Sequence, residues 1–179
     1  MRVAISTGGG DAPGLNAVIR AIVLSAHQRD WQCYGIRRGF DGLLGNEGIM
    51  KLGPREVRGI THQGGTILGT TNRGNPFHWV VKDAEGNPVQ LDRSDELVDA
   101  FRASGFDALI SIGGDGSLAI AQQLHEKGLP VVGVPKTIDN DVSRTLTTFG
   151  FDTAVSTATD AIDKLHSTAE SHERVMVVE

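Results

Sequence analysis

The stretch Ala-Leu-Ile-Ser-Ile-Gly-Gly-Asp-Gly-Ser at residues 108–117 decides the fold. Residues 108–112 are mostly apolar and predict a short strand, and the glycines that follow predict a tight loop. Helical spacing over 118–127, closed by Gly128, and a second apolar run over 131–134 continue the pattern. A strand that reaches the next strand through a helix predicts parallel pairing, because parallel neighbours need such a crossover.

The same order of elements occurs at the N-terminus. Residues 3–7 predict a strand, a glycine-rich turn follows, residues 16–29 carry apolar side chains at helical spacing, and residues 32–36 predict a second strand. Residues 37–74 are rich in turn-forming residues and predict no regular element.

Further elements follow along the chain. The sequence predicts a hairpin of strands over 79–82 and 89–91, a helix over 95–103, a long helix over about 152–167 and an apolar strand over 175–178. Short apolar strands that alternate with helices predict an α/β fold, with a mainly parallel sheet covered by helices on both faces. Ligands of such sheets bind beyond the carboxyl ends of the strands, so the loops there are expected to converge.

The end of the chain carries an expectation of its own. A buried strand that stops at Glu179 would have no following segment to lead the chain to the surface. Residues 1–179 are therefore expected to be the front part of a longer chain.

The composition excludes several classes of function. The chain has 17 Lys and Arg against 22 Asp and Glu, a net charge of −5, which argues against general binding of nucleic acid or an acidic membrane surface. One cysteine, Cys33, forms no internal disulfide, and nothing approaches a signal sequence or a membrane-spanning run, so a cytoplasmic location is expected. The 23 glycines gather in clusters, which is typical of turns or ligand-binding loops.

The first glycine loop covers residues 8–16 and lacks the lysine of a P-loop. Its glycines precede a helix N-terminus, where backbone N–H groups and the positive end of the helix dipole can bind a phosphate. The alternative is a tight turn that needs glycine only for its backbone angles.

The second loop, residues 113–117, places Asp115 among glycines between a strand and a helix. A carboxylate beside phosphate-binding amides suits Mg²⁺, which takes one or two carboxylates together with substrate oxygens. Capping of the following helix by Asp115 is the alternative.

The third loop, residues 135–141, holds Asp139 and Asp141 two positions apart. Neighbouring carboxylates repel each other, so one can act as a general base while the other is held by hydrogen bonds or a cation. Phosphorylation of an alcohol needs such a base. A turn rich in Asp and Asn is the alternative.

Taken together, these loops resemble the 6-phosphofructokinase family. The resemblance runs over essentially the whole chain in the family's order and spacing, and it rests on residues 9–16, 64–69, 113–117, 135–141, 149–154 and 171–174. It implies a Rossmann-like donor-binding domain over residues 1–179 that lacks the sugar-phosphate-binding half, so that this piece alone is expected to be inactive.

The resemblance also implies roles for single residues. It assigns the donor phosphates to Gly9, Gly114, Gly116 and Ser117, with added charge from Arg73, and it assigns Mg²⁺ to Asp115. Asp139 is implied as the base at the 1-hydroxyl of fructose 6-phosphate, supported by Thr137 and Asp141. Arg174 is implied to reach the sugar 6-phosphate of a neighbouring subunit, in a homo-oligomer that is usually a tetramer.

Two residues give opposite indications of the phosphoryl donor. By the resemblance, glycine at position 116 goes with ATP, because a side chain there would crowd the α-phosphate, whereas lysine at position 136 is typical of enzymes that use pyrophosphate. Steric exclusion is the stronger constraint, since a flexible lysine can also bind a nucleotide phosphate, so ATP is predicted. Pyrophosphate as donor, and a non-catalytic phosphate-binding or assembly piece, are the alternatives.

Overall fold

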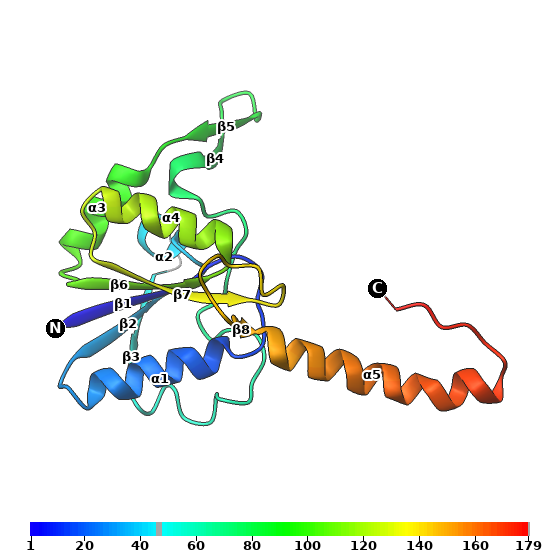
Figure 1. Ribbon diagram of the computed structural model, residues 1–179. Coiled ribbons are helices and arrows are strands. Elements are labelled where there is room, and N and C mark those ends of the chain that lie inside the picture. Colours follow the sequence, from blue (N-terminus) through cyan, green and yellow to red (C-terminus); the bar gives the residue numbers. More distant parts are fainter. Residues whose placement is uncertain (46–47, 179) are drawn as a thin grey trace.

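The computed structural model describes residues 1–45 and 48–178, and its centre is a six-stranded sheet (Figure 1). The strand order is β3-β2-β1-β6-β7-β8. The strands are β1 (Arg2–Thr7), β2 (Gln32–Ile36), β3 (Ile49–Leu52), β6 (Ala108–Gly113), β7 (Val131–Thr137) and β8 (Phe149–Gly150). All neighbours pair parallel except β2 and β3, which are antiparallel. The predicted α/β class with a mainly parallel sheet is confirmed.

Helices cover both faces of the sheet (Figure 1). Helix α1 (Leu15–His27) packs on one face, where Ile5, Ile19 and Val23 belong to one buried cluster. Helices α2 (Asp41–Leu44), α3 (Ser94–Ala103) and α4 (Asp115–Glu126) lie on the other, where Phe101 and Leu109 belong to a second. The two faces receive alternate residues of each strand, as a doubly covered sheet requires.

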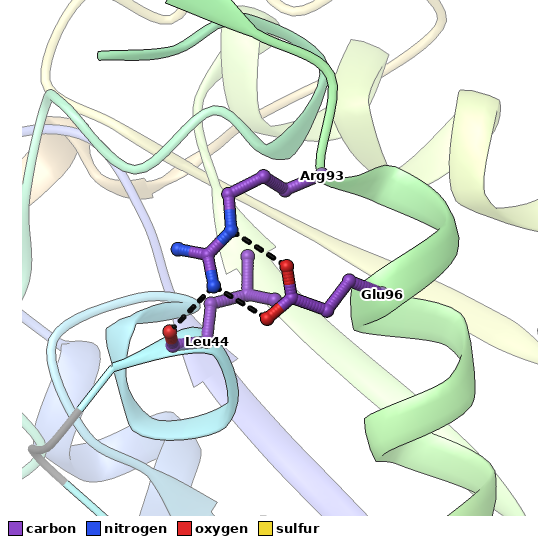
Figure 2. Close-up of polar contacts among 3 residues, drawn as sticks. All are labelled: Leu44, Arg93 and Glu96. Atoms are coloured by element: carbon purple, nitrogen blue, oxygen red, sulfur yellow. Dashed lines mark hydrogen bonds and ion pairs between the residues drawn. The ribbon is translucent and has the colours of Figure 1, made fainter. Parts of the chain in front are cut away.

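A separate hairpin of β4 (Trp79–Lys82) and β5 (Pro88–Leu91) follows a short 3₁₀ turn at Pro76–His78 and extends above α3 and α4 (Figure 1). Arg93, two residues after the end of β5, connects the hairpin to the body of the domain. Its guanidinium donates to both carboxylate oxygens of Glu96 and to the backbone carbonyl of Leu44, the last residue of α2 (Figure 2). The same guanidinium lies 5.2 Å from the ring centroid of Trp79. One side chain therefore joins the hairpin, α3 and α2.

Helix α5 (Phe151–Ser171) points away from the sheet (Figure 1) and has no buried residue. The apolar run after it corrects one prediction: residues 175–178 form no strand and are exposed, with Val175 91% exposed. An apolar run becomes a strand only when another strand or layer pairs with it, and the described part of the chain supplies neither. Glu179 lies outside the described residues.

Two observed element boundaries differ from the predicted ones. Helix α4 begins at Asp115 instead of 118, so part of the predicted loop forms its first turn, and β7 continues to Thr137 instead of ending at 134. Strand β3 and helix α2 lie in the turn-rich region that predicted no element. Among the described residues, no helix combines the length and apolar character needed to cross a bilayer.

Candidate functional site

An open cleft of about 610 Å³ lies at the carboxyl ends of β1, β6 and β7, where the three predicted loops meet. The topology causes this convergence, because these three strands are adjacent and parallel. Nine of the residues assigned from the sequence line the cleft: Gly9, Gly114, Asp115, Gly116, Ser117, Lys136, Thr137, Asp139 and Asp141.

The first and second loops approach each other closely at Gly8. The backbone N–H of Gly8 donates to the carbonyl of Ile112 at 2.9 Å. A Cβ added at Gly8 would lie 2.7 Å from the Ser117 hydroxyl oxygen, closer than real side chains approach. Glycine at position 8 therefore allows the two loops to share one wall of the cleft.

Asp115 is the first residue of α4, and the residue that caps this helix is Gly114, without a side-chain hydrogen bond. The structure thus does not support the alternative role of Asp115 as the helix cap. The first turn of α4 instead presents backbone N–H groups that have no partner within the helix, together with the positive end of the helix dipole. A phosphate could bind these N–H groups beside the Asp115 carboxylate.

The third loop has a fixed shape around Asp139. The Asp139 N–H donates to the Thr137 hydroxyl oxygen at 3.1 Å, and that hydroxyl lies 3.3 Å from the Asp139 carboxylate. Asn140 adopts a left-handed conformation with φ 52°, and its side-chain oxygen accepts the N–H of Thr148 at 2.9 Å. Thr148 is buried and donates its hydroxyl to the Thr137 carbonyl. These bonds leave the Asp139 carboxylate exposed at the cleft.

Lys136 is the buried cation of the site, only 4% exposed. Its ammonium group donates to the carbonyl of Gly10 and so links the third loop to the first. Burial lowers the pKa of Lys136, and the neighbouring Asp11 carboxylate opposes this shift.

A fourth segment, residues 63–71, supports the first loop. The buried Asn16 side chain donates to the carbonyls of Gln63 and Gly64 and accepts the N–H of Ile67. Farther along this segment, Thr70 donates its hydroxyl to the Gly9 carbonyl at 2.5 Å. Asn16 belongs to the quoted family motif, but its position in α1 gives no sequence signal for contacts with a segment about 50 residues away.

Two assigned residues lie outside the cleft lining. Arg73 is exposed, although its neighbours Asn72 and Gly74 line the cleft. Arg174 follows the end of α5, a helix of 21 residues that spans roughly 30 Å and points away from the sheet (Figure 1).

Sequence reasoning missed several residues of the cleft, among them Ser6, Phe40, Ser111 and Ile120. A polar residue near the carboxyl end of an otherwise apolar strand is the signal that could have identified the two serines. Phe40 lies in the turn-rich region, which carries no periodic pattern of apolar residues.

Among the described residues, no group of three or more His, Cys, Asp or Glu side chains could hold a metal ion. Asp115 stands beside the backbone N–H groups of the first turn of α4, an arrangement that suits a magnesium ion held by one carboxylate together with phosphate oxygens and water.

Comparison with known proteins gives concordant results. The sequence model of the family described as Phosphofructokinase matches residues 2–179. An ATP-dependent 6-phosphofructokinase of Chloroflexus aggregans is 52% identical over 181 residues, which cover 99% of this chain and 49% of that protein. A pyrophosphate–fructose 6-phosphate 1-phosphotransferase of Amycolatopsis mediterranei is 49% identical over 180 residues, covering 100% and 49%. The solved phosphofructokinase of Saccharomyces cerevisiae matches with a TM-score of 0.76 and 30% identity over 96% of this chain and 24% of that one. The chain spans about half the length of the curated relatives it matches.

Proposed function

The chain belongs to the phosphofructokinase family, and from this premise we propose that it supplies the phosphoryl-donor site and the base of an ATP-dependent 6-phosphofructokinase. The reaction transfers the γ-phosphoryl group of ATP to the 1-hydroxyl of fructose 6-phosphate and gives fructose 1,6-bisphosphate, a step of glycolysis. The observation that carries the proposal is the single cleft that joins the Asp115 end of α4 to the Asp139 loop.

The donor binds at the two glycine loops. Gly9 and the first turn of α4, with Gly114, Gly116 and Ser117, offer backbone N–H groups to the phosphates. Arg73 lies on the segment that borders the cleft and adds positive charge from its rim. These backbone N–H groups and Arg73 offset the negative charge of the donor locally, although the net charge of the whole chain is −5.

Magnesium fits the donor set at the α4 N-terminus. Asp115 supplies one hard carboxylate oxygen, and the donor phosphates supply others. When bound, the ion neutralises charge that develops on the transferring phosphoryl group.

Asp139 is the base for the sugar hydroxyl. Its carboxylate is exposed at the cleft and accepts a proton from the 1-hydroxyl as the oxygen attacks phosphorus. Thr137 and the Asn140 bond to Thr148 hold the loop, and Asp141 lines the same cleft and supports the site around Asp139.

ATP is the proposed donor because Gly116 leaves room for a nucleotide. A Cβ built at Gly116 meets no atom within 4 Å, so the space beside the helix start is open. Pyrophosphate is the second candidate, which Lys136 in the cleft favours, and one relative at 49% identity is named as a pyrophosphate enzyme.

Acceptor recognition is proposed to depend on residues outside this chain. Arg174, at the far end of α5, reaches the sugar 6-phosphate bound by a neighbouring subunit of a homo-oligomer, in the family's usual form a tetramer. A glycolytic reaction and a single free cysteine suit the cytoplasm.

The experiment that tests the proposal follows product formation by the full-length protein. With ATP labelled at the γ-phosphorus, Mg²⁺ and fructose 6-phosphate, label is expected in fructose 1,6-bisphosphate. A full-length protein that binds phosphates but forms no labelled product would support the non-catalytic alternative.

A further inference from the structure

Two serines to which the proposed function gives no role lie in the wall of the cleft. Ser6 is 2% exposed, Ser111 is 4% exposed, and both line the cleft. They are paired in register across β1 and β6. Residues paired in this way lie on the same face of adjacent strands, which are about 4.8 Å apart, so the two hydroxyls are neighbours.

Neither hydroxyl has a protein partner within residues 1–45 and 48–178. The other five buried polar residues, Thr7, Asn16, Ser94, Lys136 and Thr148, all form side-chain hydrogen bonds. No fully enclosed side-chain oxygen or nitrogen in the described part of the chain lacks a partner. The Ser6 and Ser111 hydroxyls therefore reach the open space of the cleft, where a ligand can satisfy them.

The side chains around the two hydroxyls are largely apolar. Two residues earlier on the same face, Ala4 and Leu109 are fully buried in the apolar core, and Phe40 and Ile120 line the cleft nearby. These neighbours offer the two hydroxyls no hydrogen bond, so packing gives no reason for serine at either position, whereas a ligand in the cleft does.

Position along the chain indicates what these hydroxyls bind. Ser6 stands two residues before Gly8, and Ser111 stands two residues before Gly113, at the starts of the two glycine loops. We propose that the Ser6 and Ser111 hydroxyls donate hydrogen bonds to an oxygen of the donor's phosphate chain. They would form an uncharged part of the donor site, next to the two glycine loops. This inference rests on the proposed function.

The test measures donor binding without turnover, in the full-length protein. The variants are Ser6→Ala, Ser111→Ala and the double variant, with Ser143→Ala, at an exposed position outside the cleft, as the matched control. Titration with the Mg²⁺ complex of AMP-PNP is expected to show about tenfold weaker binding for each cleft variant, because a hydrogen bond to a charged group has roughly that effect. The control is expected to bind like the unchanged protein.

A second measurement separates a ligand contact from a role in folding. The melting temperature without ligand is expected to stay the same or rise in the cleft variants, since alanine removes a hydroxyl that forms no hydrogen bond to the protein. Inorganic tripolyphosphate, which competes with AMP-PNP, is expected to lose affinity by the same factor as AMP-PNP.

Three results would overturn the inference: AMP-PNP affinity within twofold of the unchanged protein in the double variant, a lower melting temperature without ligand, or weaker binding of AMP-PNP while tripolyphosphate competes as before or not at all. If the unchanged full-length protein makes fructose 1,6-bisphosphate while the double variant binds AMP-PNP normally, only this inference fails. If the unchanged protein binds neither AMP-PNP nor pyrophosphate, the proposed function itself fails.

Discussion

The ammonium group of Lys136 donates a hydrogen bond to the backbone carbonyl of Gly10, which lies 126 residues earlier in the chain. The bond connects the end of β7 to the loop after β1, across the carboxyl end of β6, which lies between these two strands and leads to Asp115. Burial lowers the pKa of this ammonium, so the folded protein holds the charge less readily than the unfolded chain does.

This lowered pKa predicts a specific effect of pH on stability. Between the depressed folded pKa and the ordinary value of 10.5, the unfolded chain binds more protons at this residue than the folded protein. Stability relative to Lys136→Met is therefore expected to rise as pH increases toward 10.5. Melting temperatures of both proteins across alkaline pH measure this, with Lys82→Met, at an exposed lysine, as control. Parallel curves for the unchanged protein and Lys136→Met would show that the charge is not penalised.

Asp139→Asn tests the proposed role of Asp139 as the general base. The full-length variant is expected to bind donor and sugar phosphate normally and to lose about 10²-fold or more in kcat, the usual scale for loss of a general base. Steady-state kinetics with both substrates varied measure the split between kcat and KM. Asp30→Asn serves as the control, because Asp30 is exposed and its left-handed conformation suits asparagine. An unchanged kcat in Asp139→Asn removes Asp139 from the mechanism.

Asp115→Ala tests the proposed role of Asp115 in binding Mg²⁺. Loss of the single carboxylate at the start of α4 is expected to raise the Mg²⁺ concentration needed for half-maximal activity by about tenfold, because Mg²⁺ depends on few protein ligands. A Mg²⁺ titration at saturating donor makes the measurement, and high Mg²⁺ is expected to restore part of the activity. The same half-maximal concentration in both proteins would leave Asp115 without a role in metal binding.

Arg93→Ala tests the connection among the hairpin, α3 and α2 (Figure 2). The variant is expected to melt at a lower temperature, since the hydrogen bond to the Leu44 carbonyl is worth about 1 kcal/mol. Glu96→Gln, which keeps that bond, is expected to have a smaller effect because the Glu96 side chain is 56% exposed and exposed ion pairs contribute little. Equal losses in the two variants would assign the stabilisation to the ion pair instead.

The central strands of this protein were predicted well from the sequence, and the reasons are physical. The strands that became β1, β2 and β6 are apolar runs between turn residues, so local pattern determines them. The last run, residues 175–178, has the same local pattern but no partner strand among the described residues, and it stays irregular. Helix α4 begins earlier than predicted because Asp115, Gly116 and Ser117 have low helix propensity, which made them read as loop, although they form the first turn in the folded domain.

Residues of the candidate site could be predicted only where they belong to short, recognisable sequence motifs. Asp115 and Asp139 stand in recognisable loops, whereas the contacts of Asn16 with residues 63–67 and of Asn140 with Thr148 arise from tertiary packing. Ser6 and Ser111 meet only because β1 and β6 are neighbours, a pairing between strands about 100 residues apart.

The most direct measurement compares phosphoryl donors in the full-length protein at saturating fructose 6-phosphate and Mg²⁺, with Gly116→Asp measured alongside. Fructose 1,6-bisphosphate is expected to form with ATP, and the variant is expected to lose ATP use selectively, because an added side chain enters the open space beside Gly116. Equal loss with both donors in the variant would contradict the steric argument. Product formation with pyrophosphate and none with ATP in the unchanged protein would contradict the assignment of ATP as the donor.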